Sequence, residues 1–496
     1  MSLRLIALGL VTSLWIVTGS QEGTKLSAQA RGVDRSGVPR LTSTWGEDGV
    51  ARASNTKQAM LSQEPREAVS FDTPLDAPRR ARADRPTYVP GHIVVKFAEN
   101  VSDRAIRAMS AFVGASAVTE PSYADFSYLM IPADTDPVEA AAMLRGQPGV
   151  VYAEADAAIY PDYEPNDPLY KYQWGLQKLD MPRAWDINRG TSGKVTVAVL
   201  DTGVAYLTKG AMAQAPDLAG TAFVPGWDFV WNDSEPVDLD GHGTHVTGSI
   251  AQTTNNNVGV AGMAFNVKIM PIKVIYTDWD DAWDAPFPYG LSTVARAIRY
   301  AVDNGARVMN MSFGAKASNQ ATLDAMQYAI GKGAFLVVSA GNDGDAQNAA
   351  TWPAAYCKDL DGAIAVAALD YNYQRAPYST HRDYVEIAAP GGNTAADANH
   401  DGYPDGILQQ TFDETAQASG IFNRFAYRFE QGTSAAAPHV TALAALLMDQ
   451  GINSPVAIEA AMKKFATDLG PAGRDNDTGY GAIEPRATLR GLGVAR

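Results

Sequence analysis

Three residues of this chain have the types that nucleophilic catalysis requires, and each lies among small residues. Asp201 follows the apolar run 195–200, His242 lies in the segment DGHGTHV, and Ser434 lies in GTSAAAPH. Serine is a weak nucleophile near neutral pH and needs a base to take its proton, while an imidazole base needs a carboxylate to hold its tautomer. The set predicts acyl transfer, with Asp201 as carboxylate, His242 as base and Ser434 as nucleophile.

Acyl transfer also needs donors for the oxyanion that forms in the transition state. Ser434 stands at the start of an apolar helical pattern that runs to Met448. Its backbone N–H would therefore be unpaired, at the end of the helix that favours negative charge. Asn342, in the segment SAGND, is the candidate for the second donor. Taken alone, Asn342 would be interpreted as a turn residue.

The elements that must position these residues alternate between strands and helices. Unbroken apolar runs are typical of strands buried on both faces, and helical patterns lie between them. This alternation predicts an α/β fold with a mostly parallel central sheet flanked by helices, whose active residues lie at the carboxyl ends of strands. The expected strands are 195–200, 267–275, 307–313, 334–340 and 363–369, and the expected helices are 242–251, 291–304 and 319–331.

Ahead of this region the chain falls into three further parts. Residues 1–20 contain an apolar stretch too short for a comfortable membrane span, and we expect a signal peptide or an anchor, hence a secreted or extracytoplasmic protein. Residues 21–86 show no periodic pattern and are interpreted as a disordered linker. Residues 87–160 alternate strand-like and helical segments and predict a small α+β domain. The catalytic domain is expected over 165–490.

Composition excludes some partners and one means of stabilisation. The 496 residues carry a formal net charge of −15. Nucleic acid is not an expected partner, because its recognition requires a basic face. Cys357 is the single cysteine of the chain, so no intrachain disulfide can form, and a core position is expected for it.

At this point the sequence resembles the subtilisin-like serine peptidases, or subtilases. The order Asp, His, Ser along the chain is also that of subtilisin. One departure is Ala435, where the family usually has methionine. The matching blocks are AVLDTG at 198–203, DGHGTHVTG at 240–248, NMSFG at 310–314, SAGN at 339–342 and GTSAAAPHV at 432–440.

The resemblance implies a precursor that acts on polypeptide substrates. The domain at 87–160 resembles the family's inhibitory propeptide, a partner within the same chain that is removed by cleavage near 157–165. A permanent substrate-binding or partner-binding module is the alternative for this domain. The resemblance also implies a pocket for the residue before the scissile bond, lined by Ser312, Phe313, Gly314, Ser339, Ala340 and Gly341.

Two loops offer the hard oxygen ligands that calcium prefers, and no organic cofactor is expected. The first resembles the family's calcium-binding turn, and its alternative is a solvated polar turn. The second places oxygen side chains at alternating positions around Gly402, like the first nine residues of an EF-hand loop. Because Leu408 stands where that loop has glutamate, a plain acidic loop is the alternative. The candidate ligands are Asp167, Asp217, Thr254, Asn256, Val258 and Val260 for the first site, and Asp397, Asn399, Asp401 and Asp405 for the second.

Two other functions are compatible with these motifs. A non-catalytic binding protein could use the same fold, because fold does not determine function. A peptide ligase or cyclase would resolve the acyl-enzyme with an amine instead of water. The presence of all three catalytic types together with Asn342 favours an enzyme, and hydrolysis is the expected reaction.

Overall fold

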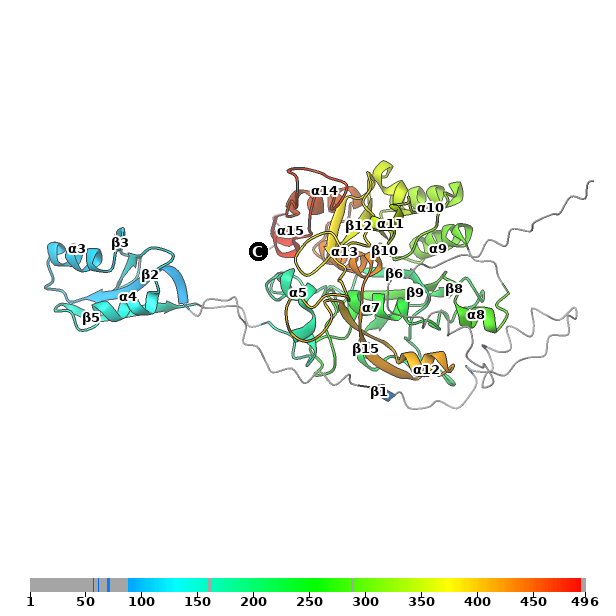
Figure 1. The fold of residues 1–496 in the computed structure, drawn as a ribbon, viewed down its shortest axis with the longest axis horizontal. Helices are drawn as coiled ribbons and strands as arrows, with labels where there is room; N and C mark the ends of the chain where they lie inside the picture. The colour runs from blue at the N-terminus through cyan, green and yellow to red at the C-terminus, as the bar shows by residue number, and fades with distance from the viewer. Residues whose placement is uncertain are drawn as a thin grey trace, which may run out of the picture. The chain divides into compact units, whose positions relative to one another are not determined.

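The computed structural model describes residues 57, 61, 69–71, 88–158, 163–286 and 290–491. The chain forms two compact units, which we call the large unit (Met1–Leu75 with Tyr163–Arg496) and the small unit (Asp76–Asp162) (Figure 1). The expected signal segment at 1–20 and residues 159–162 of the expected cleavage stretch lie outside the described residues. Among the helices that are described, none has both the length and the apolar character of a transmembrane span.

A parallel sheet forms the centre of the large unit, as the alternating pattern predicts. Its strand order is β13-β12-β11-β10-β6-β9-β7, with β8 also pairing with β9, and every pair is parallel. The strands are β6 (Thr196–Asp201), β7 (Ala222–Phe223), β8 (Trp227–Asp228), β9 (Lys268–Lys273), β10 (Val308–Met311), β11 (Phe335–Ser339), β12 (Ala363–Leu369) and β13 (Ile387–Pro390).

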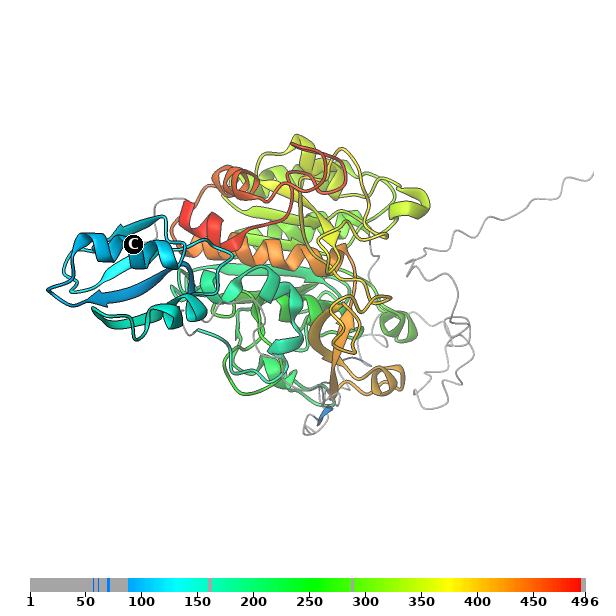
Figure 2. The ribbon, with the colours of Figure 1, turned by 60° about the vertical axis from the view of Figure 1, so that its left-hand side comes forward.

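Both faces of this sheet are covered, which explains the unbroken apolar runs. Alternate residues of β6 enter different cores: Val197 and Val199 pack on one face, Ala198 and Leu200 on the other. Helices α7 (His242–Ala251) and α13 (Thr433–Asp449) cover the first face, and α9 (Leu291–Asp303) and α10 (Gln320–Gly331) cover the second. Helix α13, orange in Figure 2, contacts β10 to β13 and α7. Helices α7 and α13 therefore pack against each other on this face of the sheet.

A second sheet of three strands, in the order β1-β15-β14, belongs to the large unit. Strands β14 (Ile407–Phe412) and β15 (Arg424–Glu430) are antiparallel, and β1 (Val69–Phe71) adds to β15 in parallel. This differs from the linker expected over 21–86. A three-residue strand stabilised by a partner more than 300 positions away leaves no local period in the sequence, so pattern analysis misses it.

The small unit has the predicted α+β architecture. Its four strands form an antiparallel sheet in the order β3-β4-β2-β5, and helix α4 packs against β2 and β5. Asp136 caps α4 by accepting a hydrogen bond from Val138 N at 2.7 Å. The unit's elements are β2 (Tyr88–Phe97), α3 (Asp103–Phe112), β3 (Ala117–Thr119), β4 (Ser127–Met130), α4 (Pro137–Leu144) and β5 (Val150–Ala157).

Short elements connect and cover the large unit. Cys357 lies in one of them and is buried in the core, as expected. These elements are η2 (Tyr170–Tyr172), α5 (Trp174–Lys178), α6 (Met181–Trp185), η3 (Pro216–Leu218), α8 (Asp278–Ala282), α11 (Gly344–Gln347), η4 (Ala354–Asp359), α12 (Glu414–Ala418), α14 (Pro455–Phe465) and α15 (Pro485–Gly491).

Candidate active site

Asp201 and His242 meet at the carboxyl end of β6. Asp201 is the last residue of β6 and is fully buried, while His242 is the first residue of α7 and its side chain is 28% exposed. His242 Nδ1 lies 2.7 Å from Asp201 Oδ1. Because an ionised carboxylate only accepts hydrogen bonds, Nδ1 carries the proton of the neutral imidazole. Nε2 is then the basic nitrogen, as a general base requires.

Two glycines allow the first turn of α7 to approach Asp201. A Cβ at Gly243 would lie 2.1 Å from Gly203 O and 3.1 Å from Asp201 Cβ. Gly241 has a φ of +106° and faces Thr411, whose Oγ1 would lie 2.5 Å from an added Cβ. Contacts this short exclude any side chain, so both positions require glycine. The two glycines of the DGHGTHV segment therefore let the first turn of α7 lie against the end of β6.

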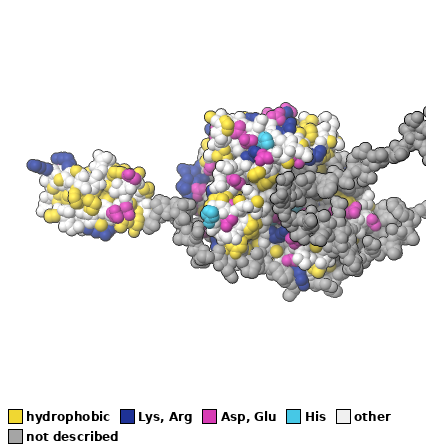
Figure 3. Space-filling model, in the orientation of Figure 1, with side chains coloured by type: hydrophobic (Ala, Val, Ile, Leu, Met, Phe, Trp, Pro, Cys, Tyr) yellow, Lys and Arg dark blue, Asp and Glu magenta, His cyan; other side chains and the backbone are white. Residues whose placement is uncertain are grey.

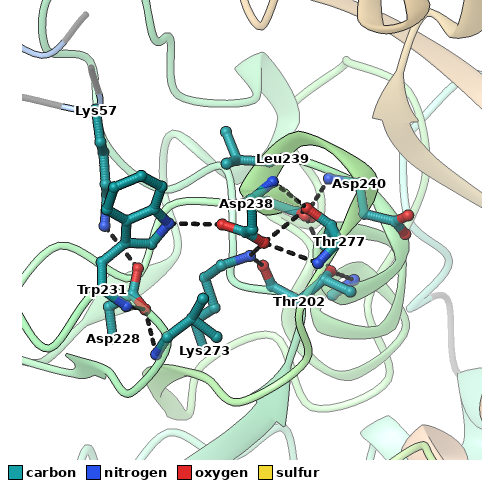
Figure 4. A network of polar contacts seen from close by, with 12 residues as sticks. Lys57, Thr202, Asp228, Trp231, Asp238, Leu239, Asp240, Lys273 and Thr277 are labelled. Atoms are coloured by element: carbon teal, nitrogen blue, oxygen red, sulfur yellow. Dashed lines mark hydrogen bonds and ion pairs between the residues drawn. The ribbon is translucent and has the colours of Figure 1, made fainter. Parts of the chain in front are cut away.

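A buried carboxylate that the sequence analysis missed holds these two segments together. Asp238 accepts five hydrogen bonds, from Thr202 Oγ1, Asp240 N, Gly241 N, Thr244 N and Thr244 Oγ1, at 2.6–3.0 Å. Its neighbour in the network is Lys273, which donates to Thr202 O at 2.8 Å (Figure 4). The Asp238 carboxylate therefore binds both the Asp201 end of β6 and the start of α7. No motif marks Asp238, because its partners are identified only by the fold.

The Asp201 carboxylate controls the proton affinity of His242. Burial alone lowers the pKa of His242, but the charge and the hydrogen bond of Asp201 outweigh this effect. With smaller contributions from Glu430 and Asp240, they raise the pKa above its ordinary value of 6.5. The imidazole is therefore neutral, and able to accept a proton, only on the alkaline side of that value.

Ser434 lies in the first turn of α13, as predicted, and its backbone is held in place. Ser312 Oγ donates to Ser434 O at 2.9 Å, and Asn310 Nδ2 donates to Ser312 Oγ at 2.9 Å. Within the described residues, no hydrogen bond joins the Ser434 hydroxyl to His242, and the Ser434 N–H has no acceptor. Catalytic hydrogen bonds are often long without substrate and shorten when it binds. Ser312, expected as a pocket residue, is 2% exposed and positions the backbone of Ser434.

Asn342 and the Ser434 N–H converge on one point beside Gly432. A Cβ built on Gly432 would lie 3.4 Å from Asn342 Nδ2 and 3.5 Å from Ser434 N. Thr433 orients the Asn342 amide, because its N–H and its hydroxyl both donate to Asn342 Oδ1 at 2.9 Å. This leaves Nδ2 to donate. Thr433 lies in a motif block, but its role was not predicted, because only the fold brings it to Asn342.

The segments expected to line the pocket meet at Thr351. A Cβ at Gly314 would lie 2.0 Å from Thr351 Cγ2, and one at Gly341 would lie 2.5 Å from Thr351 Oγ1. Glycine is thus required on both walls. Phe313 is half-buried and packs on the core of the α9–α10 face. In the described part of the chain, the backbone groups of Phe313 and Gly314 have no hydrogen-bond partner, so an extended peptide could pair with them.

The other residues expected in the pocket are less accessible. Ser339 and Ala340 are buried at the end of β11, and Ala340 O accepts from Tyr384 Oη at 3.0 Å. Gly341 is only half-buried, and its N–H donates to Thr433 Oγ1 at 3.1 Å. Ala435, the departure from the family pattern, is buried against Trp174 and Ile407. The large indole beside it accounts for a small residue at this position.

Two buried carboxylates face the loop that follows α7. Asp167 Oδ2 accepts from Asn255 N at 2.7 Å, and Asp217 Oδ1 accepts from Asn256 Nδ2 at 2.9 Å. Asp217 is fully buried, and Asp167 is 4% exposed. Burial raises the pKa of Asp217 to about 7, and no cation of the described residues lowers it. The backbone of Thr254, Val258 and Val260 belongs to the same loop.

The second predicted loop binds mainly its own backbone. Asp397 accepts from Asp401 N and Gly402 N at 3.1 and 3.2 Å, and Asn399 Nδ2 donates to Asp401 Oδ2 at 3.0 Å. Asp405 Oδ2 accepts from Ala398 N at 2.6 Å, while its buried Oδ1 has no partner within the described residues. Across those residues, no group of three or more acidic, histidine or cysteine side chains is placed to hold a metal. A second calcium site stays a prediction.

Comparison with known proteins identifies the family of each unit. A model of the subtilase family matches residues 192–481, and a model of the fervidolysin N-terminal prodomain matches residues 75–156. A thermophilic serine proteinase of Bacillus sp. (strain AK1) is 34% identical over 392 residues, which cover 79% of this chain and 85% of that protein. Thermitase of Thermoactinomyces vulgaris is 37% identical over 312 residues, which cover 63% of this chain and 94% of thermitase.

A solved structure shows the same architecture. The crystal structure of fervidolysin from Fervidobacterium pennivorans, a keratinolytic enzyme related to subtilisin, aligns with a TM-score of 0.54 and 25% identity. The alignment covers 87% of this chain and 64% of that one. With the parallel sheet, the Asp201–His242 pair and the match of the family model over more than half of the residues, the chain belongs to the subtilase family of serine endopeptidases, and its small unit is a fervidolysin-like prodomain.

Proposed function

We propose that this protein hydrolyses peptide bonds through Ser434, with His242 as general base and Asp201 as the orienting carboxylate. The hydrogen bond between His242 Nδ1 and Asp201 Oδ1 is the observation that carries the proposal, because it leaves Nε2 as the basic nitrogen. Nε2 takes the proton of Ser434 as Oγ attacks the scissile carbonyl, and returns it to the leaving amine. Water then attacks the acyl-enzyme, assisted by the same base.

Asn342 Nδ2 and the Ser434 N–H would stabilise the oxyanion. Both donors flank one point beside Gly432, and the start of α13 favours negative charge there. The substrate would pair its backbone with Phe313 and Gly314 and place one side chain between the walls that meet at Thr351. Thr351 takes the space that side chains at Gly314 and Gly341 would need, so Thr351 would border the bound side chain.

Replacing Asn342 by alanine is expected to lower kcat about 10²–10³-fold, the size known for the corresponding donor of subtilisin. KM should change little, because the amide donates to the oxyanion and not to the ground-state carbonyl. Steady-state kinetics on a chromogenic peptide measure both parameters. Asn372→Ala, at an exposed position, is the matched control. A rise in KM at unchanged kcat would contradict the oxyanion role.

Maturation by removal of the small unit is part of the proposal. Seven of the eleven exposed large hydrophobic side chains among the described residues lie in this unit, although it is much the smaller of the two. Figure 3 shows apolar side chains on its visible face. Such exposure is typical of a surface that binds a partner. We propose that this partner is the catalytic domain, that cleavage occurs near 157–165, and that the precursor is exported through its segment 1–20.

Calcium is proposed as a structural ion at the loop after α7. The available donors are all oxygens: two carboxylates, the Asn256 amide, and the carbonyls of Thr254, Val258 and Val260, which suits a hard cation. Bound there, calcium would neutralise two buried carboxylates. Asn256 Oδ1 now accepts from Val258 N at 2.8 Å, so the amide would have to turn to become a ligand.

We expect calcium to raise the melting temperature by roughly 5 °C at a concentration about 100-fold above its Kd. The change to test is Asp217→Asn, which removes one buried charge and should abolish this increase. Calorimetry in calcium and in a chelator measures the effect. Asp397→Asn, in the second loop, is the control and should keep the full increase. A response lost only in Asp397→Asn would place the ion in the second loop instead.

A further inference from the structure

Lys57 lies in the part of the sequence expected to be a linker, yet its ammonium is buried in the large unit. Its side chain is 2% exposed. Nζ lies 2.6 Å from Asp228 Oδ2, 3.1 Å from Asp233 Oδ1 and 2.7 Å from Glu235 O. Figure 4 shows Lys57 reaching Asp228 beside Trp231. A residue about 170 positions away in sequence thus donates hydrogen bonds to three oxygens of one loop.

This loop is built to receive a cation. Asp228 is fully buried at the end of β8, and its Oδ1 accepts from Val230 N and Trp231 N, both at 2.9 Å. Oδ2 is thus left for Lys57 as its hydrogen-bond partner. When a buried carboxylate loses its cationic partner, its charge remains buried without the interaction that offset the free-energy cost of desolvation. The contact between Lys57 and Asp228 should therefore be energetically significant, unlike an exposed ion pair.

Two further contacts attach the same stretch of chain. Leu61, four residues after Lys57 and helical like it, is 2% exposed and packs in the core cluster that contains Val230 and Trp231. Lys57 and Leu61 therefore contact the same region of the large unit, around Trp231. Strand β1 then pairs with β15, Val69 opposite Arg424 and Phe71 opposite Ala426. Lys57 thus makes an ionic contact with the rest of the large unit, Leu61 an apolar contact and β1 a backbone contact.

We infer that Lys57, Leu61 and β1, which we call the arm, bind the catalytic domain independently of the prodomain and keep the amino-terminal fragment associated after maturation. The inference rests on the proposed cleavage near 157–165, which would cut the chain between the arm and its binding surface. The prodomain would remain tethered through the arm. Such a tether holds the inhibitor at a high effective concentration, so that full activation requires loss of the arm as well.

The retention experiment uses the full chain with a carboxyl-terminal tag. After self-processing, the tagged protein is captured, diluted and analysed by intact mass spectrometry for the amino-terminal fragment. We expect the wild type to retain the fragment and Lys57→Met to retain at least fivefold less. Lys358→Met, which removes a half-exposed lysine paired with Asp383 on the same unit, is the matched control and should behave as wild type.

A second measurement does not depend on processing. In the uncut Ser434→Ala precursor, Lys57→Met is expected to lower the melting temperature of the large unit by about 5 °C or more. Adding Asp228→Asn should restore part of this loss, because the unpaired charge is removed. If the protein with Ser434 intact does not cut itself, but the Ser434→Ala precursor still shows this decrease and rescue, then the proposed maturation has failed and the arm has not. Equal melting temperatures with and without Lys57→Met, or equal retention in the cut proteins, would overturn the inference.

Discussion

We expect Ser434→Ala to fold as the wild type does and to hydrolyse peptides about 10⁶-fold more slowly, the size found for loss of the nucleophile in subtilisin. The hydroxyl is the attacking group, whereas the hydrogen bond from Ser312 is made to the backbone of Ser434 and survives the substitution. The variant should also retain its prodomain uncut. Turnover of a peptide substrate, the melting temperature and the intact mass of the purified protein measure the three expectations.

Ser419→Ala, at the exposed end of α12, is the control for loss of a hydroxyl and should leave turnover unchanged. A fluorophosphonate probe should label the wild type at Ser434 and fail to label the variant. Turnover by Ser434→Ala at the wild-type rate would exclude the proposed nucleophile. A labelled wild type whose products are joined peptides, by mass, would support the ligase instead of the hydrolase.

Replacing Asp201 by asparagine should lower kcat about 10⁴-fold and move the pH dependence. In the wild type Asp201 raises the pKa of His242, so the neutral base forms only as the pH rises past this raised value. The rise of kcat/KM with pH should therefore have its midpoint above 6.5. In Asp201→Asn the raising charge is lost while burial still lowers the pKa, so the midpoint should move to lower pH. The maximum of kcat/KM stays low in this variant because no carboxylate at position 201 fixes the tautomer of His242.

The measurement is kcat/KM on a peptide substrate without ionisable side chains, from pH 5 to 10. Asp324→Asn removes one exposed carboxylate of α10, on the opposite face of the sheet, and should keep the wild-type profile. A profile for Asp201→Asn with the wild-type midpoint would contradict the control of His242 by Asp201. A loss of less than tenfold would contradict the orienting role.

Much of the architecture could be predicted from the sequence, because its signals are local. Strands buried on both faces must be apolar at every position, and β6, β11 and β12 appear as unbroken runs for that reason. The α+β pattern of the small unit was equally accessible, since α3 and α4 are the helical segments between its strands. Strand β3 leaves no such signal in the sequence, because all three of its residues are exposed.

The candidate site also combines residues that the sequence identifies with residues that only the fold reveals. The residue types Asp, His and Ser, and the glycines beside them, identify the chemistry, because catalysis restricts which side chains can serve. Thr433 and Asp238 orient the site, but no local pattern in the sequence distinguishes them from other residues. Their importance comes from partners that the fold brings to them, such as Asn342 for Thr433 and Thr202 for Asp238.

The reaction class and the layered fold could thus be predicted from the sequence alone, and so could the three residues proposed for catalysis, since these predictions depend on side-chain chemistry and on periods along the chain. Three contacts could be found only in the folded chain: Ser312 holds the backbone of Ser434, Asp238 links the end of β6 to α7, and Lys57 enters an acidic loop of the large unit. These are contacts between residues about 35 to 170 positions apart. Hydrogen bonds and ion pairs of this range follow from where the packed core places each segment, which no local pattern encodes.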